Sequence, residues 1–134
     1  MYPADVSQDR PLDVFMAHMD VVFSDETELP LRVEDGRIYC PGVGDDTACL
    51  VCLLLAGKYI ARHVDSPSWR EIRGEDAPGL LLVCNAGEEG LGNLKGVRKI
   101  CEDYGGRIKS FCTFDSSLSS IVDRAVGSKR FRVK

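Results

Sequence analysis

The sequence predicts an α/β layer fold with a largely parallel sheet. Three short apolar segments, 12–17, 80–85 and 110–114, have the length of buried strands, and two longer segments between them, 46–62 and 94–104, have the length of helices. Strands that alternate with helices indicate β-α-β units, in which the strands run parallel. With 134 residues, of which 44% are hydrophobic, the chain is long enough for one domain with one core.

After the first strand, the sequence predicts a hairpin and then the clearest helix of the chain. Residues 31–40 have an Asp-Gly dipeptide at their centre, which is typical of a tight hairpin turn. In residues 46–62, leucine and alanine recur near a 3.6-residue period, which indicates a helix. Asp46 or Thr47 is placed to cap this helix.

The second half of the chain predicts a connection, a helix and further strands. Residues 64–78 hold two prolines and a glycine among many charges, so we expect an exposed connection there. The helix at 94–104 stops at a pair of glycines. Beyond the strand at 110–114, residues 121–126 and 130–133 are candidates for two more strands.

Charge and composition exclude several classes of function. Twenty-one acidic and 17 basic residues give a net charge of -4 without a basic cluster that would track a phosphate backbone, so we expect no nucleic-acid partner. The longest apolar stretch, 48–56, is too short to span a membrane, and residues 1–10 do not resemble a signal peptide. We therefore expect a cytoplasmic protein without a membrane partner. Most of the six cysteines lie in apolar runs, which favours reduced core thiols.

Residues suited to metal chemistry follow the predicted strands. His18 and Asp20 end the first strand, Asp45 precedes the first helix, the pair Glu88-Glu89 follows the second strand, and Asp115 follows the third. An open α/β sheet usually places its ligand site at the carboxyl ends of its strands. Histidine and carboxylates are ligands that zinc prefers. An H-x-D spacing also allows Asp20 to turn back toward the ring of His18 and fix its tautomer.

Each of these motifs has a structural explanation when it is taken alone. A histidine at a strand end is more often a satisfied structural residue than a ligand, and a Glu-Glu pair is usually solvated surface. The pair Asp45-Asp46 alone is typical of a helix cap. Their joint occurrence in this order favours a common site.

The ordered motifs resemble a known family. The segments H-M-D-V-V, P-G-V-G-D-D-T-A, N-A-G-E-E-G-L-G-N and F-D are similar to those of the co-catalytic di-zinc peptidases that include tripeptidase T, the aminoacylases and succinyl-diaminopimelate desuccinylase. The resemblance covers about residues 12–134. It implies a three-layer α/β/α zinc-exopeptidase-like domain with a mostly parallel mixed sheet, and hydrolysis of a peptide or related amide bond.

The resemblance also implies a role for each site residue. His18 and Asp115 would bind one zinc ion, with Asp20 supporting His18, and Glu89 would bind the second ion. Asp45 would bridge the two, ahead of a cis peptide bond to Asp46. Glu88 would be the general base that takes a proton from the shared water and passes it to the leaving amine. Co²⁺ or Mn²⁺ is an alternative to Zn²⁺ at such ligands.

One ligand of the family pattern is missing. Family members carry a lid and dimerisation domain inside the catalytic domain, and the last metal-binding histidine follows it. This chain has only His18 and His63, and we do not expect His63, at the end of a helix, to be a ligand. We therefore expect residues 1–134 to form a partial catalytic domain that is inactive in isolation. The full-length protein would be a homodimer through the missing lid domain.

Other functions are less favoured by the sequence. The Cys49-x-x-Cys52 pair, with Cys40, is a candidate thiolate site in a non-catalytic metal-binding module, but no second pair stands at zinc-finger spacing. A nucleotide site at Gly42-Val43-Gly44 lacks the third glycine of a dinucleotide fingerprint and the lysine of a phosphate loop. Within the family, di- or tripeptides are the expected substrates, followed by N-acyl amino acids.

Overall fold

The computed structural model describes residues 9–24, 26–74, 76–115, 120–124, 127 and 133. In chain order the elements are β1 (Leu12–His18), β2 (Arg32–Glu34), β3 (Arg37–Tyr39), α1 (Ala48–His63), α2 (Pro67–Arg73), β4 (Gly79–Asn85), α3 (Lys95–Tyr104) and β5 (Ile108–Thr113). An irregular turn, Val43–Thr47, leads into α1, and a short 3₁₀ turn, Gly105–Arg107, follows α3.

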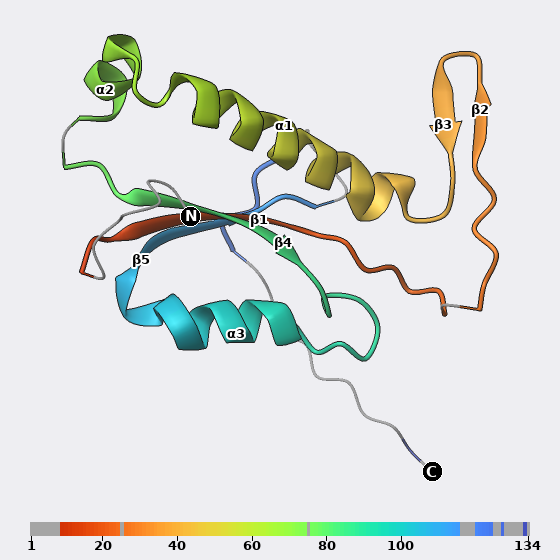
Figure 1. Cartoon of the computed structure of the whole chain (residues 1–134). Helices are drawn as coiled ribbons and strands as arrows, with labels where there is room; N and C mark the ends of the chain where they lie inside the picture. Colours follow the sequence, from red (N-terminus) through yellow and green to blue (C-terminus); the bar gives the residue numbers. More distant parts are fainter. Residues whose placement is uncertain are drawn as a thin grey trace.

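The central sheet has three parallel strands in the order β4-β1-β5. β1 lies in the middle and pairs along its whole length with β4, from Leu12 opposite Gly79 to His18 opposite Asn85. α1 covers one face of this sheet and α3 covers the other (Figure 1). The α/β fold with a largely parallel sheet is therefore confirmed.

The chain path explains why the two helices lie on opposite faces. The connection from β1 through α1 leads to β4 at one edge, whereas the connection from β4 through α3 passes β1 to reach β5 at the other edge. Because crossovers between parallel strands are right-handed, reversing the direction of travel moves the helix to the opposite face (Figure 1). All three strands consequently end at the same edge of the sheet.

Alternate side chains of β1 supply both hydrophobic cores. Leu12 and Val14 point to the face of α3, where they pack with Leu81, Ile100 and Tyr104. Phe15 and Ala17 point to the face of α1, where Ala17 packs with Cys49 and Leu53. This period of two is expected for a strand that is covered on both faces. This packing on both faces holds His18 in a fixed position at the end of β1.

The predicted hairpin is confirmed as a separate two-stranded unit. β2 and β3 pair antiparallel, with Val33 opposite Ile38, and the turn residues Asp35 and Gly36 both have positive φ, as a tight hairpin turn requires. The hairpin stands away from the central sheet (Figure 1).

Two expectations about individual segments were wrong, and a third is tested only in part. The connection at 64–78 contains the helix α2, which Ser66 caps by accepting a hydrogen bond from the amide of Trp69. Neither Asp46 nor Thr47 gives α1 a side-chain cap. Residues 121–124 form no strand, and the rest of the two C-terminal strand candidates falls largely outside the described residues.

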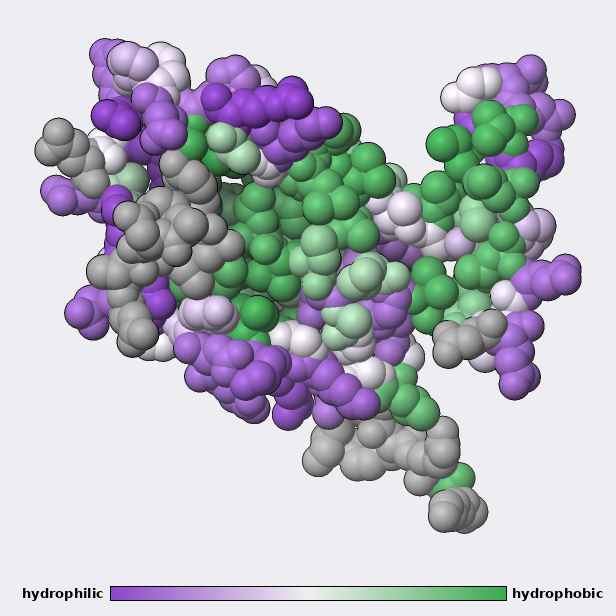
Figure 2. All heavy atoms as spheres, viewed as in Figure 1, coloured by the Kyte–Doolittle hydropathy of each residue, from purple (hydrophilic) through white to green (hydrophobic). Residues whose placement is uncertain are grey.

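Apolar surface remains uncovered over α1 and the hairpin (Figure 2). Val51, Leu54, Leu55 and Tyr59 of α1 are exposed, and a groove of about 440 Å³ runs between this helix and β4. In the part of the chain that the structure describes, no single helix has the length and apolar composition to cross a membrane. Only α1 with its leading turn, taken together with α2, reaches that length and composition, and the two are bent by 114° relative to each other.

Candidate metal centre

The candidate site is built at the carboxyl ends of β1 and β4. His18 and Asn85 are opposite each other in the last register position of this strand pair. The amide of Met19 then donates a hydrogen bond of 2.9 Å to the carbonyl of Asn85, so the two segments leave the sheet side by side. This pairing brings the loop that follows His18 next to the loop that carries Glu88 and Glu89.

The ring of His18 is buried and oriented from both sides. Its Nδ1 lies 3.0 Å from the backbone carbonyl oxygen of Asp20, and because a carbonyl only accepts, Nδ1 carries the proton. Its Nε2 lies 3.0 Å from Oδ1 of Asp45. Burial lowers the pKa of His18, but the hydrogen bonds to Asp45 and to the Asp20 carbonyl, together with the charges of Asp46 and Glu88, leave the pKa above its ordinary value of 6.5.

Asp45 reaches this ring from the irregular turn before α1. The peptide bond between Asp45 and Asp46 is cis, in agreement with the resemblance. Gly42, at the start of the turn, lies so close to Val21 that an added Cβ would be 2.3 Å from the Val21 side chain. The turn is thus packed directly on the segment that leaves β1, and the half-exposed carboxylate of Asp45 faces His18.

Asp20 anchors the glutamate loop. Its two carboxylate oxygens accept hydrogen bonds from the amides of Glu88 at 3.4 Å and Glu89 at 3.0 Å. Partial burial raises the pKa of Asp20, but these amide hydrogen bonds outweigh it and hold the pKa below its ordinary value. We expected the carboxylate to hold the ring of His18, yet it lies 3.6 Å from Nδ1, and the nearer contact is made by the backbone carbonyl.

Glu88 is placed to exchange a proton at this edge. Its Oε2 lies 4.0 Å from Nε2 of His18, and about a third of its side chain is exposed. Burial raises the pKa of Glu88, His18 lowers it, and the nearby carboxylates of Glu89, Asp115 and Asp20 raise it further, so the net pKa lies above its ordinary value. A carboxylate with a raised pKa is a better proton acceptor, as a general base requires.

Three side chains converge closely enough to share a metal ion. One ligand atom each from His18, Asp45 and Glu89, hereafter the metal cluster, lies within 4.8 Å of the other two. An imidazole nitrogen with two carboxylates is a donor set suited to zinc, and a cation would take the place of the proton that Nε2 shares with Asp45, while Nδ1 keeps its proton on the Asp20 carbonyl. The residues therefore fit a divalent ion. Asp115 follows β5 at the same edge but is not among these three residues.

Sequence reasoning missed the buried residue beside the metal cluster. We considered Asp46 as a helix cap, but its side chain is buried and its Oδ2 accepts a hydrogen bond of 3.0 Å from the backbone amide of His18. The adjacent pair Asp45-Asp46 was the available signal, because neighbouring residues in an extended turn point in different directions. One carboxylate of the pair could therefore face the metal cluster while the other, Asp46, was buried.

The geometry does not favour the two alternative sites. Cys49 is buried and Cys52 is exposed, and no cysteine belongs to the group of described residues that could hold a metal ion. Burial and the adjacent Asp46 raise the pKa of Cys49 to about 12, which disfavours a thiolate ligand. The carboxylates of Asp45 and Asp46 stand before α1, where a nucleotide would place its phosphates, and would repel them.

His63 is remote from the metal cluster. It lies in the last turn of α1, whose first turn faces the candidate site, and its Nδ1 contacts the carbonyl of Tyr59 at 2.8 Å. Its ring also stacks on that of Tyr59, with 4.1 Å between the ring centroids. These contacts are those of a structural residue at the end of a helix and do not bring His63 to the metal cluster.

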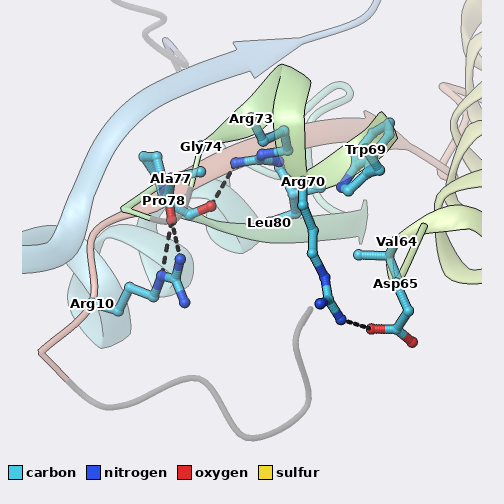
Figure 3. A pocket seen from close by; sticks show the side chains of 10 residues that line it. All are labelled: Arg10, Val64, Asp65, Trp69, Arg70, Arg73, Gly74, Ala77, Pro78 and Leu80. Carbon is cyan, nitrogen blue, oxygen red and sulfur yellow. Dashed lines mark hydrogen bonds and ion pairs between the residues drawn. The ribbon is translucent and has the colours of Figure 1, made fainter. Parts of the chain in front are cut away.

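A cavity of about 380 Å³ lies at the opposite end of the strands, near the start of β4 (Figure 3). Its arginines are engaged with the protein itself. Arg10 donates to the carbonyl of Ala77, Arg73 donates to the carbonyl of Pro78, and Arg70 forms an ion pair with Asp65. These contacts hold the segment before β4 in place. The residues suited to metal binding lie at the other end of the strands, the carboxyl edge of the sheet.

Comparison with known proteins identifies the family. The sequence profile of peptidase family M20/M25/M40 matches residues 14–126. This range includes every residue of the metal cluster together with Asp20, Glu88 and Asp115. No curated protein matches the chain. Because the profile covers most of its length, the chain belongs to peptidase family M20/M25/M40, a family of metallopeptidases and related hydrolases.

Proposed function

We propose that this chain carries most of the metal site of a zinc-dependent exopeptidase that hydrolyses a peptide or related amide bond of small peptides. The observation that carries the proposal is the convergence of His18, Asp45 and Glu89 within 4.8 Å at the carboxyl edge of a parallel sheet. Membership of the peptidase family supports a hydrolytic use of this cluster.

Each residue then has a defined task. His18, Asp45 and Glu89, together with Asp115 at the same edge of the sheet, would hold the two zinc ions. When bound, the two ions supply polarisation of the scissile carbonyl and a lowered pKa of the attacking water. Asp20 fixes the His18 ring through its carbonyl and the glutamate loop through its carboxylate. Co²⁺ or Mn²⁺ would serve with the same ligands.

Proton transfer is the task of Glu88. Its Oε2 takes a proton from the attacking water and delivers it to the nitrogen of the leaving amine, which departs as a neutral group. The raised pKa of Glu88 favours the first half of this transfer, because the carboxylate binds the proton more readily than an exposed glutamate would.

The ligand count indicates a longer enzyme. The metal cluster has one histidine, and the only other histidine, His63, is held at the far end of α1. We propose that a further histidine comes from a segment beyond these residues, together with a lid domain through which the full-length protein dimerises. In that protein, di- or tripeptides with a free amino terminus are the first candidate substrates, and N-acyl amino acids are the second. The isolated chain would then have little or no activity.

Metal content tests the site. After zinc loading and removal of free ion, we expect the wild-type chain to retain zinc, and His18→Ala or Asp45→Ala to lose it because each removes a ligand. Asp65→Asn, which changes an exposed carboxylate far from the metal cluster, is the matched control. Equal zinc content in all four proteins would contradict the proposed site.

Turnover tests the role of Glu88 separately. In the longer protein that supplies the remaining ligand, Glu88→Gln should retain zinc and lose hydrolysis of tripeptides by at least about a hundredfold, because the amide cannot accept the proton. Unchanged turnover with zinc still bound would remove Glu88 from the mechanism.

A further inference from the structure

Asp46 is a deeply buried carboxylate with only part of its hydrogen-bonding capacity used. Its residue is 1% exposed, and Oδ2 accepts the backbone amide of His18 at 3.0 Å. Its Oδ1 is also buried and accepts no hydrogen bond of ordinary geometry from the described residues, and the Cys49 thiol is the weak donor that interacts with the carboxylate. Buried carboxylates are normally satisfied by several donors or by a counter-charge, so this arrangement is incomplete in the protein alone.

No ion pair between described residues supplies that counter-charge. None of these ion pairs includes Asp46. The charge of Asp46 does act on the His18 ring, whose pKa it helps to raise, so it would act in the same way on a cation bound by that ring. Asp46 is the sequence neighbour of one member of the metal cluster, Asp45, and is hydrogen-bonded to the backbone of another, His18.

We propose that Asp46 is a positioning residue for the metal ion. One carboxylate oxygen fixes the backbone of His18, and the buried negative charge increases the affinity of the metal cluster for a divalent cation. Groups that contact the ligands rather than the ion affect metal binding in this way. The inference rests on the proposed function, because it assumes that the metal cluster binds an ion.

Asp46 also connects the two segments that must approach each other. β1 and the turn before α1 are separated by the hairpin in sequence, and the hydrogen bond from His18 to Asp46 joins them directly. The same bond fixes where Asp45 stands relative to the His18 ring, since Asp45 and Asp46 share one peptide unit. Both the hydrogen bond and the charge thus act on the geometry of the metal cluster.

The substitution Asp46→Asn separates the charge from the hydrogen bond. Asparagine has the same shape and still offers an oxygen to the amide of His18, but it carries no charge. We expect it to weaken zinc binding by about 10- to 100-fold, measured by competition with a chelator of known affinity. The melting temperature of the metal-free protein should stay the same or rise, because an uncompensated buried charge is removed.

Asp65→Asn is the matched control for net charge, because Asp65 is exposed and its loss changes the total charge by the same amount. Its zinc affinity should equal that of the wild type. Asp46→Ser removes the charge with a shorter side chain, and it is the second uncharged variant if Asp46→Asn does not fold.

The outcomes separate this proposal from the proposed function. Zinc binding that is weakened in Asp46→Asn at unchanged thermal stability supports the role of the charge. Wild-type affinity in a folded Asp46→Asn protein overturns it while the metal site stands. Parallel losses of affinity and melting temperature also overturn it, in favour of a structural hydrogen bond alone. A wild-type chain that binds no zinc overturns both proposals.

Discussion

At the scale of single residues, Asp20 joins the two halves of the candidate site. Its carbonyl contacts the His18 ring and its carboxylate accepts the amides of Glu88 and Glu89. The H-x-D spacing predicted a contact between Asp20 and the His18 ring, but the backbone carbonyl rather than the carboxylate makes the nearer contact. It did not predict the contact with the glutamate loop, because that loop is brought alongside only by pairing between strands that are distant in sequence.

This arrangement predicts a pH-dependent contribution to stability. Asp20→Asn should lower the free energy of unfolding by about 1–3 kcal/mol at pH 7, because two amides lose a charged acceptor. The pKa of Asp20 is lowered on folding from 3.8, so its contribution is present above that pH and is lost as pH falls through the folded-state pKa. Urea unfolding between pH 7 and pH 3 measures the difference, and a difference independent of pH would contradict this account.

The cysteines differ in reactivity for an equally local reason. Cys49 is buried and its pKa is raised to about 12 by burial and by Asp46, whereas Cys52, Cys84, Cys101 and Cys112 are exposed. We expect iodoacetamide to modify the four exposed thiols of the native protein and to reach Cys49 only after unfolding. Peptide mass spectrometry at timed intervals measures this order. Early labelling of Cys49 would show that α1 does not pack on the sheet as described.

At the scale of elements, α3 approaches the end of β4 without space for a side chain. A Cβ added to Gly96 would be 1.6 Å from Oδ1 of Asn85 and 2.7 Å from the carbonyl of Ala86. Gly96→Ala should therefore lower the free energy of unfolding by about 1–3 kcal/mol, because the helix must move away from the strand. Gly105→Ala, at a position with open space, is the control, and equal stability of the two variants in urea would contradict this packing.

Elements with strong local signals were predicted, and elements with weak or ambiguous signals were not. The hairpin turn at Asp35-Gly36 depends on its own two residues, so the sequence alone was enough. α2 was missed because Pro67 was interpreted as a breaker, although Ser66-Pro67 is also a typical helix start, with the serine as cap and the proline in the first turn. The cap predicted for α1 failed because Asp46 has a stronger interaction elsewhere, with the amide of His18.

At the scale of the whole molecule, the convergence of the site was predictable but the order of the strands was not. Parallel strands of one sheet end at a common edge, so residues placed after each apolar run were expected to meet. The central position of β1 depends on pairing with two distant segments, and no local pattern encodes it.

The uncovered apolar surface predicts self-association of the isolated chain. Leu54 and Leu55 of α1 are 54% and 60% exposed, beside the groove along the edge strand β4. Such surfaces promote association in water, so the mass measured by light scattering during size exclusion should rise with protein concentration. Lysine at both positions should reduce this rise, whereas Ile72→Lys on α2 should not. A constant monomer mass for the wild type would contradict the expectation.

The central position of β1 also bears on how the protein is made. Among the three strands of the sheet, β1 is synthesised first, and its neighbours β4 and β5 leave the ribosome only after the hairpin and α1 have followed it. Until then its apolar residues have no partner strand on either side, and long-range pairing of this kind is slow. Of the three strands, the one that carries His18 is thus the first to leave the exit tunnel, and it stays without strand partners until both neighbours have been synthesised, which leaves it open to binding by a chaperone during that time.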